Sequence, residues 1–530
     1  MTAPTDTSRP TELPRVDRAA DGSIPLLWGW RYRNWFFLLL AGSVLFRLAY
    51  TPLVPLTGDE LMHWQWSRHL ALGYPEHPPM IAWLMAVNTS LFGTFQTTVR
   101  LATVLSVTGL FAIAFQLGRE LFDERAAFFG VVPLMLTPFF NAGGVLANTD
   151  GLLAFFWAVA VYGAKKAVLD GKRWAWLLFA SGAGLALLSK TTALFLIPST
   201  ALVLVATPEG RAWLRRWEPY AATVLALLFF SPQLIWSMQH DWITFSMRVG
   251  HQSAGGLTLV FLGELVAAQL ALVTPVLFVW VVWGLWKSWR NRADSRAVLL
   301  GAYMAVPFLS YSAYSLTARA GVHWPAIGYV TGFIAAGAFT AAVTRPRFAR
   351  RFMTIACVPA VLITGLLLYI PVFPERISMT WSYWGRPEKV STGQLDNIFD
   401  WGEVGATVRE VYDQGSGDAF LLCRDGYGFA GLMAFYTPGR PDTFIWKLQR
   451  RNGVAYDMWR AEADLVGRDA VIVEERWNQE WFDELRGSFD SMSEPRHLEI
   501  HRADRVIKEF YVIYGTNFAG FPDVSADAAR

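Results

Sequence analysis

The sequence predicts a polytopic α-helical membrane protein that carries a soluble α/β domain at its C-terminus. Of its 530 residues, 53% are hydrophobic and only 17% are charged, and the mean hydropathy is +0.29. The apolar residues form long runs, which is typical of membrane proteins. After Pro374 the density of charged residues rises, and short apolar segments alternate with helical patterns. This change of pattern predicts a separate domain outside the membrane.

Roughly eleven segments are long and apolar enough to cross a bilayer, since a spanning helix needs about 20 mostly apolar residues. They are residues 35–53, 98–118, 127–146, 149–169, 174–190, 191–207, 220–237, 258–286, 297–316, 323–343 and 353–373. Met80–Phe92 is shorter and follows a pair of prolines. Its length is expected of an interfacial or re-entrant helix. We expect about 11–13 transmembrane helices in all.

Positive charges set the expected orientation of these helices. Residues 1–33 are polar and rich in proline, so we expect a disordered cytoplasmic tail. If Met80–Phe92 does not cross, the later clusters of lysine and arginine fall on the cytoplasmic side, as the positive-inside rule requires. These clusters account for the basic residues, and the net charge is only +3. Nucleic acid is therefore not an expected partner.

The same topology places nearly all the unusual polar residues at helix ends on the outer face. They are Asp59, Glu60, Glu76, His77, Asp150, Lys190, His240, Asp241, Arg248, His251, Arg319 and His323. Ionisable groups at membrane depth are costly and usually mark a pathway or a site. Their shared face predicts a functional site on the outer side of the membrane.

The expected domains are a transmembrane domain over residues 34–374, with a first external loop over 54–97, and a C-terminal domain over 375–530. An odd number of spans puts the C-terminal domain on the outer side. Its pattern predicts strands at 419–423 and 469–474 and helices at 403–412 and 428–436. It contains no G-x-G-x-x-G after a strand, so a nucleotide site there has little support.

Two adjacent carboxylates, Asp59 and Glu60, follow the first span and precede an aromatic stretch that ends at Trp66. One interpretation is that they cap the next helix, whose positive N-terminus favours acidic residues. The other is that they are catalytic groups at the membrane surface. Their position in the sequence leaves both interpretations open.

Asp150 and Lys190 each lie at the outer end of a predicted span. Asp150 taken alone is favoured as a helix cap. Lys190 lies between two spans with almost no loop, so it either extends its amine to the interface or binds an anion. The occurrence of Asp59, Asp150 and Lys190 on one predicted face favours a shared functional role over three separate structural ones.

Four strings in order resemble the bacterial branch of the protein O-mannosyltransferase family and the related lipid A aminoarabinose transferases. The strings are GDELMHWQWSRHLALGYPEHPPMIAWL, NTDGLLAFFW, GLALLSKTTAL and GVHWPAIGY, and LMAFYTPGRPDTFIW resembles the soluble domain of many of these proteins. These families belong to the GT-C class of glycosyltransferases, which use polyprenyl-phosphate sugars. The resemblance implies a GT-C fold with surface helices over a cavity at the membrane boundary.

The resemblance also implies roles for individual residues. Asp59 would activate the acceptor as general base, with Glu60 beside it, and Glu76 and His77 would face the carrier phosphate and sugar. Asp150 matches a second acidic position, and Lys190 would contact the donor phosphate with His77, Arg248 or His323 as helpers. The position of His77 is a lysine in the aminoarabinose transferases. Asp59, Glu60 and Asp150 are oxygen donors of the kind that bind a divalent metal, whose use is left open.

The implied enzyme moves a sugar from an undecaprenyl-type phosphate donor to a lipid, lipopolysaccharide or protein acceptor, with inversion at the anomeric carbon. The implied location is the bacterial inner membrane, with the active site and the C-terminal domain in the periplasm. A transporter or flippase of lipid-linked sugars is the main alternative, although transporters often show repeated halves that this sequence lacks. A membrane-anchored scaffold is a third interpretation, and it leaves Asp59, Asp150 and Lys190 without a role.

Overall fold

The computed structural model describes residues 31–250, 256–342, 346–372, 399–415, 419–424, 426–446, 454–459, 462–502 and 505–521. Most of the predicted cytoplasmic tail, residues 1–30, lies outside the described residues. The chain forms two compact units. The first unit comprises residues 1–51, 71–93 and 100–368, and the second comprises residues 52–70, 94–99 and 369–530. Residues 52–70, from the predicted external loop, therefore belong to the same unit as the C-terminal domain.

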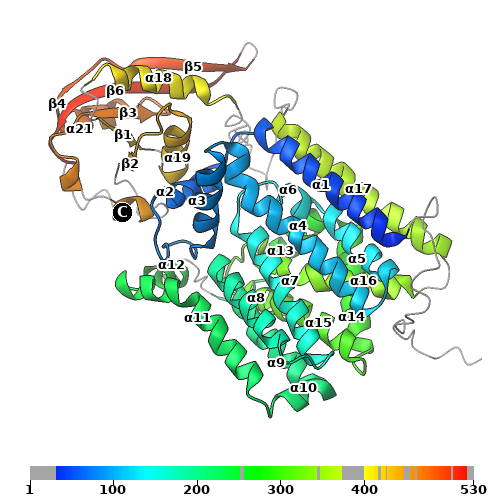
Figure 1. Cartoon of the computed structure of the whole chain (residues 1–530). Coiled ribbons are helices and arrows are strands. Elements are labelled where there is room, and N and C mark those ends of the chain that lie inside the picture. Colours follow the sequence, from blue (N-terminus) through cyan, green and yellow to red (C-terminus); the bar gives the residue numbers. More distant parts are fainter. Residues whose placement is uncertain are drawn as a thin grey trace, which may run out of the picture. The chain divides into compact units, whose positions relative to one another are not determined.

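The first unit is helical (Figure 1). Its elements are α1 (Tyr32–Tyr50), η1 (Thr51–Leu53), α3 (Met80–Phe92), α4 (Gln96–Leu121), α5 (Glu124–Leu136), α6 (Pro138–Ala142), α7 (Thr149–Val168), α8 (Ala175–Ser189), η2 (Thr191–Phe195), α9 (Leu196–Ala206), α10 (Pro208–Trp213), α11 (Glu218–Gln239), α12 (Ile243–Gly250), α13 (Val260–Val273), α14 (Pro275–Arg290), α15 (Ser295–Tyr314), η3 (Trp324–Gly328), α16 (Tyr329–Ala341) and α17 (Pro346–Val372). Helices α1 and α17 lie side by side, and the Tyr50 hydroxyl donates to the Leu368 carbonyl at 2.9 Å.

Six helices of the described chain are long and apolar enough to cross a membrane: α4, α7, α11, α15, the α1 helix with its 3₁₀ extension, and residues 351–372 of α17. The chain is thus a multi-pass membrane protein, but fewer full-length spans are found than the roughly eleven segments predicted. The predicted span 258–286 is wrong as one helix, because α13 and α14 meet at Thr274 with a bend of 108°. Other predicted spans correspond to shorter apolar helices, such as α8 and the pair η2 and α9.

The hairpin of α7 and α8 packs closely because each helix has a small residue facing the other. A side chain added at Gly163 of α7 would place its Cβ 2.6 Å from the Phe179 backbone nitrogen of α8. One added at Gly182 of α8 would lie 2.6 Å from the Ala160 nitrogen of α7. Such contacts let two helix backbones approach one another. Because the two helices are consecutive and pack as a hairpin, the start of α7 and the end of α8 lie at the same end of the pair.

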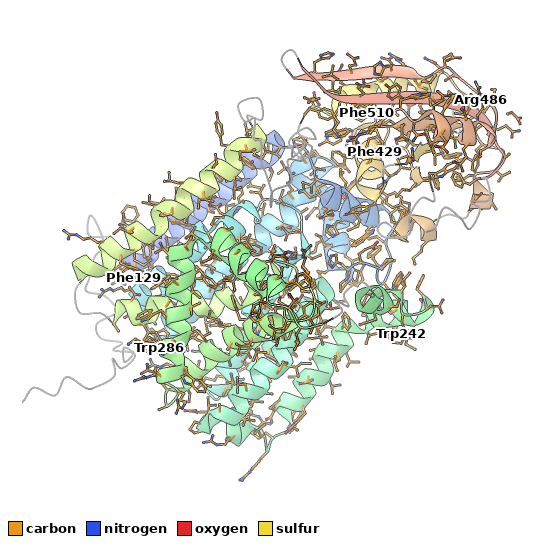
Figure 2. The ribbon with its side chains drawn as sticks, turned by 180° about the vertical axis from the view of Figure 1, so that it is seen from behind. Phe129, Trp242, Trp286, Phe429, Arg486 and Phe510 are labelled. Carbon is orange, nitrogen blue, oxygen red and sulfur yellow. The ribbon has the colours of Figure 1, made fainter. Side chains whose placement is uncertain are left out.

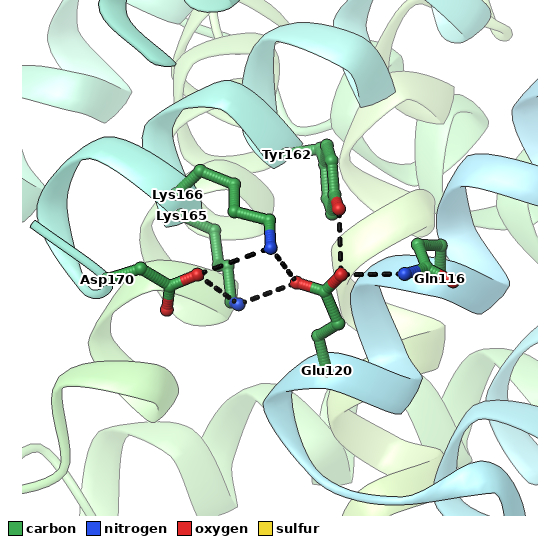
Figure 3. A network of polar contacts seen from close by, with 6 residues as sticks. All are labelled: Gln116, Glu120, Tyr162, Lys165, Lys166 and Asp170. Atoms are coloured by element: carbon green, nitrogen blue, oxygen red, sulfur yellow. Dashed lines mark hydrogen bonds and ion pairs between the residues drawn. The ribbon is translucent and has the colours of Figure 1, made fainter. Parts of the chain in front are cut away.

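The other end of this hairpin is joined to α4 by a network of charged groups (Figure 3). Glu120 of α4 accepts from Lys165 at 2.8 Å, from Lys166 at 2.7 Å and from the Tyr162 hydroxyl at 2.8 Å. Asp170 completes the network at 2.8 Å from the Lys165 amine. Two lysines are thus balanced by two carboxylates, which makes this end of α7 a firm attachment to α4.

The second unit contains a mixed sheet in the order β2-β1-β3-β6-β4, with β5 pairing with β6. Its elements are α2 (Gly58–Arg68), α18 (Gly402–Asp413), β1 (Phe420–Cys423), α19 (Gly426–Tyr436), β2 (Thr443–Ile445), α20 (Val454–Trp459), η6 (Glu462–Asp464), β3 (Ala470–Glu474), α21 (Gln479–Arg486), β4 (Phe489–Met492), β5 (Arg496–Arg502) and β6 (Arg505–Phe518). Strands β2, β1 and β3 are parallel, and β6 runs antiparallel to β3.

The predicted α/β character of the C-terminal domain is confirmed, with the two predicted strands and two predicted helices found within about two residues of their expected bounds. Helices α18 and α19 pack on the sheet through an apolar core. In that core the rings of Phe429 of α19 and Phe510 of β6 stack with their centroids 6.1 Å apart (Figure 2). This packing fixes the start of α19 relative to the sheet.

The contact between α7 and α8 makes a testable prediction. Replacing Gly182 with alanine should lower the melting temperature of the purified protein, because the new methyl group meets the backbone of α7. Gly365→Ala is the matched control, since a Cβ at this helical position meets nothing within 4 Å. The control should leave stability unchanged or raise it by up to about 1 kcal/mol through helix propensity. Equal effects of the two substitutions on thermal unfolding in detergent would contradict the packing argument.

Candidate active site

Three of the predicted site residues meet in the first unit. The Lys190 amine lies 2.8 Å from Asp150 Oδ1 and 2.9 Å from Oδ2, so it is bound by both oxygens of that carboxylate. The same amine lies 3.1 Å from His323 Nε2, and this ring nitrogen is 3.5 Å from Asp150 Oδ2. The Lys190 side chain is only 8% exposed. Residues that are 173 positions apart in the chain thus form one polar cluster.

Asp150 is available for this cluster because another residue caps its helix. The side chain of Asn148 accepts from the Gly151 backbone N–H at 2.9 Å and is the N-cap of α7. Asn148 is itself held by its amide donations to the Gly143 and Leu146 carbonyls. The interpretation of Asp150 as the helix cap is therefore wrong. Its carboxylate lies in the first turn of α7, where the helix dipole favours negative charge.

Lys190 occupies the break between α8 and η2. Its backbone is extended, with φ −161° and ψ 136°, and its N–H donates to the Ala186 carbonyl to end α8. The positive side chain thus lies at the C-terminus of a helix, where its charge is favoured. The close pairing of α7 and α8 brings this residue to the end of the hairpin that carries Asp150.

His323 precedes η3 and is positioned by a buried glutamine. The Gln269 amide of α13 donates to the Val322 carbonyl at 2.7 Å and accepts from the Tyr329 hydroxyl at 2.9 Å. Gln269 is 3% exposed. Helix α13, which ends at the bend into α14, therefore holds the backbone next to His323 through Gln269. Neither Gln269 nor this role is indicated by the sequence, where Gln269 is a single polar residue in an apolar run.

The arrangement is suited to hold an anion. A lysine amine has three N–H donors, and here they face two carboxylate oxygens and one histidine nitrogen. The longest of these contacts is the one to His323, at 3.1 Å, and the Asp150 carboxylate orients the amine through both of its oxygens. In a largely buried site such a charge acts more strongly than it does in water.

Asp59 and Glu60 belong to the second unit, and they differ in exposure to solvent and in hydrogen-bond partners. Glu60 is 1% exposed, and its carboxylate accepts from the Thr57 backbone N–H at 2.9 Å, while Thr57 Oγ1 accepts from the Glu60 N–H. This reciprocal capping box is the structural role foreseen for the pair, and Glu60 fulfils it. Asp59 is exposed, and its Oδ1 accepts from the Tyr427 hydroxyl of α19 at 2.7 Å.

Glu76 and His77 lie in the loop 71–79 of the first unit. Both are half-buried, and both carboxylate oxygens of Glu76 and the Nδ1 of His77 are shielded from solvent. The loop is held by Tyr74, whose carbonyl accepts from Thr244 at 3.1 Å and whose hydroxyl accepts from the Ala71 N–H. Burial raises the pKa of Tyr74 to about 12, so this hydroxyl stays neutral at physiological pH.

Arg248, another predicted helper, falls in α12, and its side chain lies outside the described residues. The two predicted metal candidates, Asp59 and Asp150, bond to Tyr427 and Lys190 respectively. Within the described ranges, no three histidine, cysteine, aspartate or glutamate side chains gather as ligands for a metal ion.

An apolar pocket of about 200 Å³ borders the same helices that carry Lys190. Its lining follows α8 from Trp176 to Leu187 and continues along α9 and the first half of α11. Among the residues that line it, none is charged. Leu187 and Ala193, which flank Lys190 in sequence, are part of this lining. A lining of this composition is chemically compatible with a hydrocarbon chain.

Sequence similarities to known proteins agree with this geometry. Residues 76–236 match the family model described as dolichyl-phosphate-mannose-protein mannosyltransferase, and this segment includes Glu76, His77, Asp150 and Lys190. The lipid A galacturonosyltransferase RgtD of Rhizobium johnstonii is 29% identical over 286 residues, which are 52% of this chain and 59% of the relative. The chain thus matches less than two thirds of that relative's length.

The fold resembles the crystal structures of ArnT from Cupriavidus metallidurans. The apo structure superposes with a TM-score of 0.61 at 14% identity, over 91% of this chain and 98% of that one. The structure bound to undecaprenyl phosphate gives the same score and coverage at 15% identity. The predicted GT-C fold is thereby confirmed, as is the resemblance to the mannosyltransferase and lipid A transferase families.

The Asp150–Lys190 pair makes a prediction that needs no substrate. Asp150→Ala should lower the melting temperature strongly, because removal of one partner leaves a buried charge uncompensated at a cost of about 3–5 kcal/mol. The double variant Asp150→Ala/Lys190→Met removes both charges and should be more stable than Asp150→Ala alone. Thermal unfolding in detergent measures both. The single variant Lys190→Met completes the comparison. If the loss of stability in the double variant equals the sum of the losses in the two single variants, the pairing is contradicted.

Proposed function

We propose that the protein is a membrane glycosyltransferase that moves a sugar from a polyprenyl-phosphate donor to a lipid or lipopolysaccharide acceptor. The observation that carries the proposal is the Lys190 amine, buried among membrane helices and held by Asp150 and His323. A charge at this depth is costly and is kept where an ion or substrate binds. The apolar pocket along α8 and α9 supports a donor with an isoprenoid tail.

In the proposed reaction Lys190 binds the phosphate of the donor, and Asp59 acts as general base. The acceptor hydroxyl gives its proton to the Asp59 carboxylate while its oxygen bonds to the anomeric carbon. The bond from that carbon to the phosphate oxygen breaks, and its electron pair leaves with the phosphate. The added negative charge is stabilised by Lys190, whose stronger interaction with the leaving group than with the bound donor lowers the barrier.

Attack from the side opposite the phosphate inverts the anomeric centre. One carboxylate and one cation are sufficient for this single displacement, because the phosphate is already a good leaving group. General base catalysis by a positioned carboxylate contributes about 10²–10⁴-fold. Glu60 has no direct part in this mechanism, since its carboxylate caps α2 and thereby fixes the backbone that carries Asp59.

The proposed location of the reaction is the periplasmic face of the inner membrane. The argument is the positive-inside rule, which places the basic clusters of the chain on the cytoplasmic side. Lys165 and Lys166 belong to such a cluster, at the end of α7 opposite to Asp150. Lys190, Asp59 and the C-terminal domain then share the outer side.

Galacturonic acid linked to undecaprenyl phosphate is the first donor to test, with lipid A as acceptor. The similarity to a protein named lipid A galacturonosyltransferase and the fold of a protein crystallised with undecaprenyl phosphate support this choice. The activity of the whole chain with this pair is part of the proposal.

Mass spectrometry of envelope lipids tests the function in cells. Deleting the gene should remove one sugar-sized mass from a lipid or lipopolysaccharide, and wild-type protein should restore it. Asp59→Asn and Lys190→Ala should fail to restore it, because the first removes the base and the second removes the cation. Arg319→Ala is the control: it removes an exposed cation that pairs with Glu264, and it should restore the product fully.

Full restoration of the product by Asp59→Asn would rule out Asp59 as the general base. If deletion of the gene changes no covalent mass but alters the distribution of a lipid across the membrane, the protein is a transporter and not a glycosyltransferase. Each variant is first shown to be present in the membrane at the wild-type amount, so that loss of product reports loss of chemistry.

A further inference from the structure

Helix α2 packs against the C-terminal domain and belongs to the same unit. The Gln65 amide donates to the Thr443 hydroxyl at 3.0 Å, and Arg68 bonds to Asp442 at 2.9 Å. The rings of Trp64 and Phe435 meet edge to face with centroids 5.0 Å apart. These contacts lie within the second unit and run along most of α2.

At the N-terminus of α2 the two helix backbones touch. A Cβ added to Gly58 would lie 2.9 Å from the Cα of Gly428, and one added to Gly428 would lie 3.2 Å from the Cα of Gly58. Asp59 follows the first of these glycines, and Tyr427 precedes the second. Any larger residue at either glycine would separate the helices, so the pair of glycines sets the distance between the two side chains.

Helix α19 is also anchored at its own start. Gly426 has φ +83°, a left-handed conformation that a residue with a side chain rarely adopts. This residue turns the chain from β1 into α19, and Phe429 then enters the apolar core of the domain. Tyr427 thus lies between a glycine in the left-handed conformation and a ring in the apolar core.

We infer that Tyr427 is a positioning residue for Asp59, and this inference rests on the proposed function. The 2.7 Å hydrogen bond from the Tyr427 hydroxyl to Asp59 Oδ1 orients an otherwise exposed carboxylate. One oxygen is occupied by the tyrosine, and Oδ2 is presented to take the proton of the acceptor hydroxyl. The C-terminal domain therefore contributes to catalysis through Tyr427, by fixing the base.

An exposed aspartate needs such a fixed partner because its side chain is otherwise free to rotate. A base that is misplaced by about 1 Å loses roughly 10²-fold in rate. A hydrogen bond to a charged group is among the stronger interactions that hold a side chain in place. Tyrosine is well suited to this task, since its ring is rigid and its hydroxyl has a fixed reach.

Tyr427→Phe tests the inference, with Tyr436→Phe as the matched control. Tyr436 is at the other end of α19, and its hydroxyl bonds to the Leu56 N–H and the Gln96 amide at 3.1 Å each. Both substitutions remove one hydroxyl from the same helix. Only the first removes a bond to the proposed base.

With undecaprenyl phosphate-linked galacturonic acid and lipid A, Tyr427→Phe should lower kcat about 10-fold or more while the KM for the donor stays unchanged. Tyr436→Phe should leave kcat unchanged and lower only the melting temperature. In the Asp59→Asn background, Tyr427→Phe should have no further effect on kcat. An unchanged kcat in Tyr427→Phe, beside a strong loss in Asp59→Asn, would overturn the positioning role alone.

A second measurement is independent of substrate. The effects of Tyr427→Phe and Asp59→Ala on the melting temperature should be less than additive, because both remove the same hydrogen bond. Additive effects would overturn the inferred bond even if the sugar donor is a different one. Retention of product by Asp59→Asn in cells would instead overturn Asp59 as the base, and an unchanged covalent mass after deletion of the gene would overturn the proposed function, so these failures are distinguishable.

Discussion

A lysine amine that is buried at the end of an apolar helix requires a compensating negative charge, and in the first unit this requirement brings separate segments of the chain together. Lys190 is neutralised by Asp150 at 2.8 Å and contacts His323 at 3.1 Å. These residues come from α7, from the end of α8 and from the segment before η3, so three separate parts of the chain must be held together. The tight α7–α8 hairpin and the Gln269 anchor supply that support. Without the ion pair, the buried charge of Lys190 would lose its bond to both oxygens of the Asp150 carboxylate.

Helix capping decides which acidic residues remain available for chemistry. In α7 the cap is Asn148, and the carboxylate of Asp150 is left for Lys190. In α2 the carboxylate of Glu60 closes the capping box with Thr57, and the adjacent Asp59 stays exposed. In both helices a residue other than the aspartate makes the capping hydrogen bond. The two aspartates with proposed functions, Asp150 and Asp59, bond to Lys190 and Tyr427 respectively.

The two units divide the proposed chemistry between them. The first unit carries the cation and the apolar pocket, which suit a phosphate and its hydrocarbon tail. The second carries Asp59 together with Tyr427, and α2 is bound into it by side-chain contacts along its length. In the proposed mechanism the C-terminal domain has a direct role, because its Tyr427 orients Asp59, the group proposed to accept the proton.

The sequence alone determined the membrane class, the α/β character of the C-terminal domain and the polar residues at helix ends, because apolar run length and charge are local properties. It also indicated Asp150, Lys190 and His323, although not that they meet. Only the tertiary structure decided the bend at Thr274, the meeting of Asp150, Lys190 and His323, and the bond from Tyr427 to Asp59. Asp59 and Tyr427 are 368 positions apart, and nothing in either segment specifies the other. Their pairing depends on the contact of Gly58 with Gly428, which exists only once α2 has packed against α19.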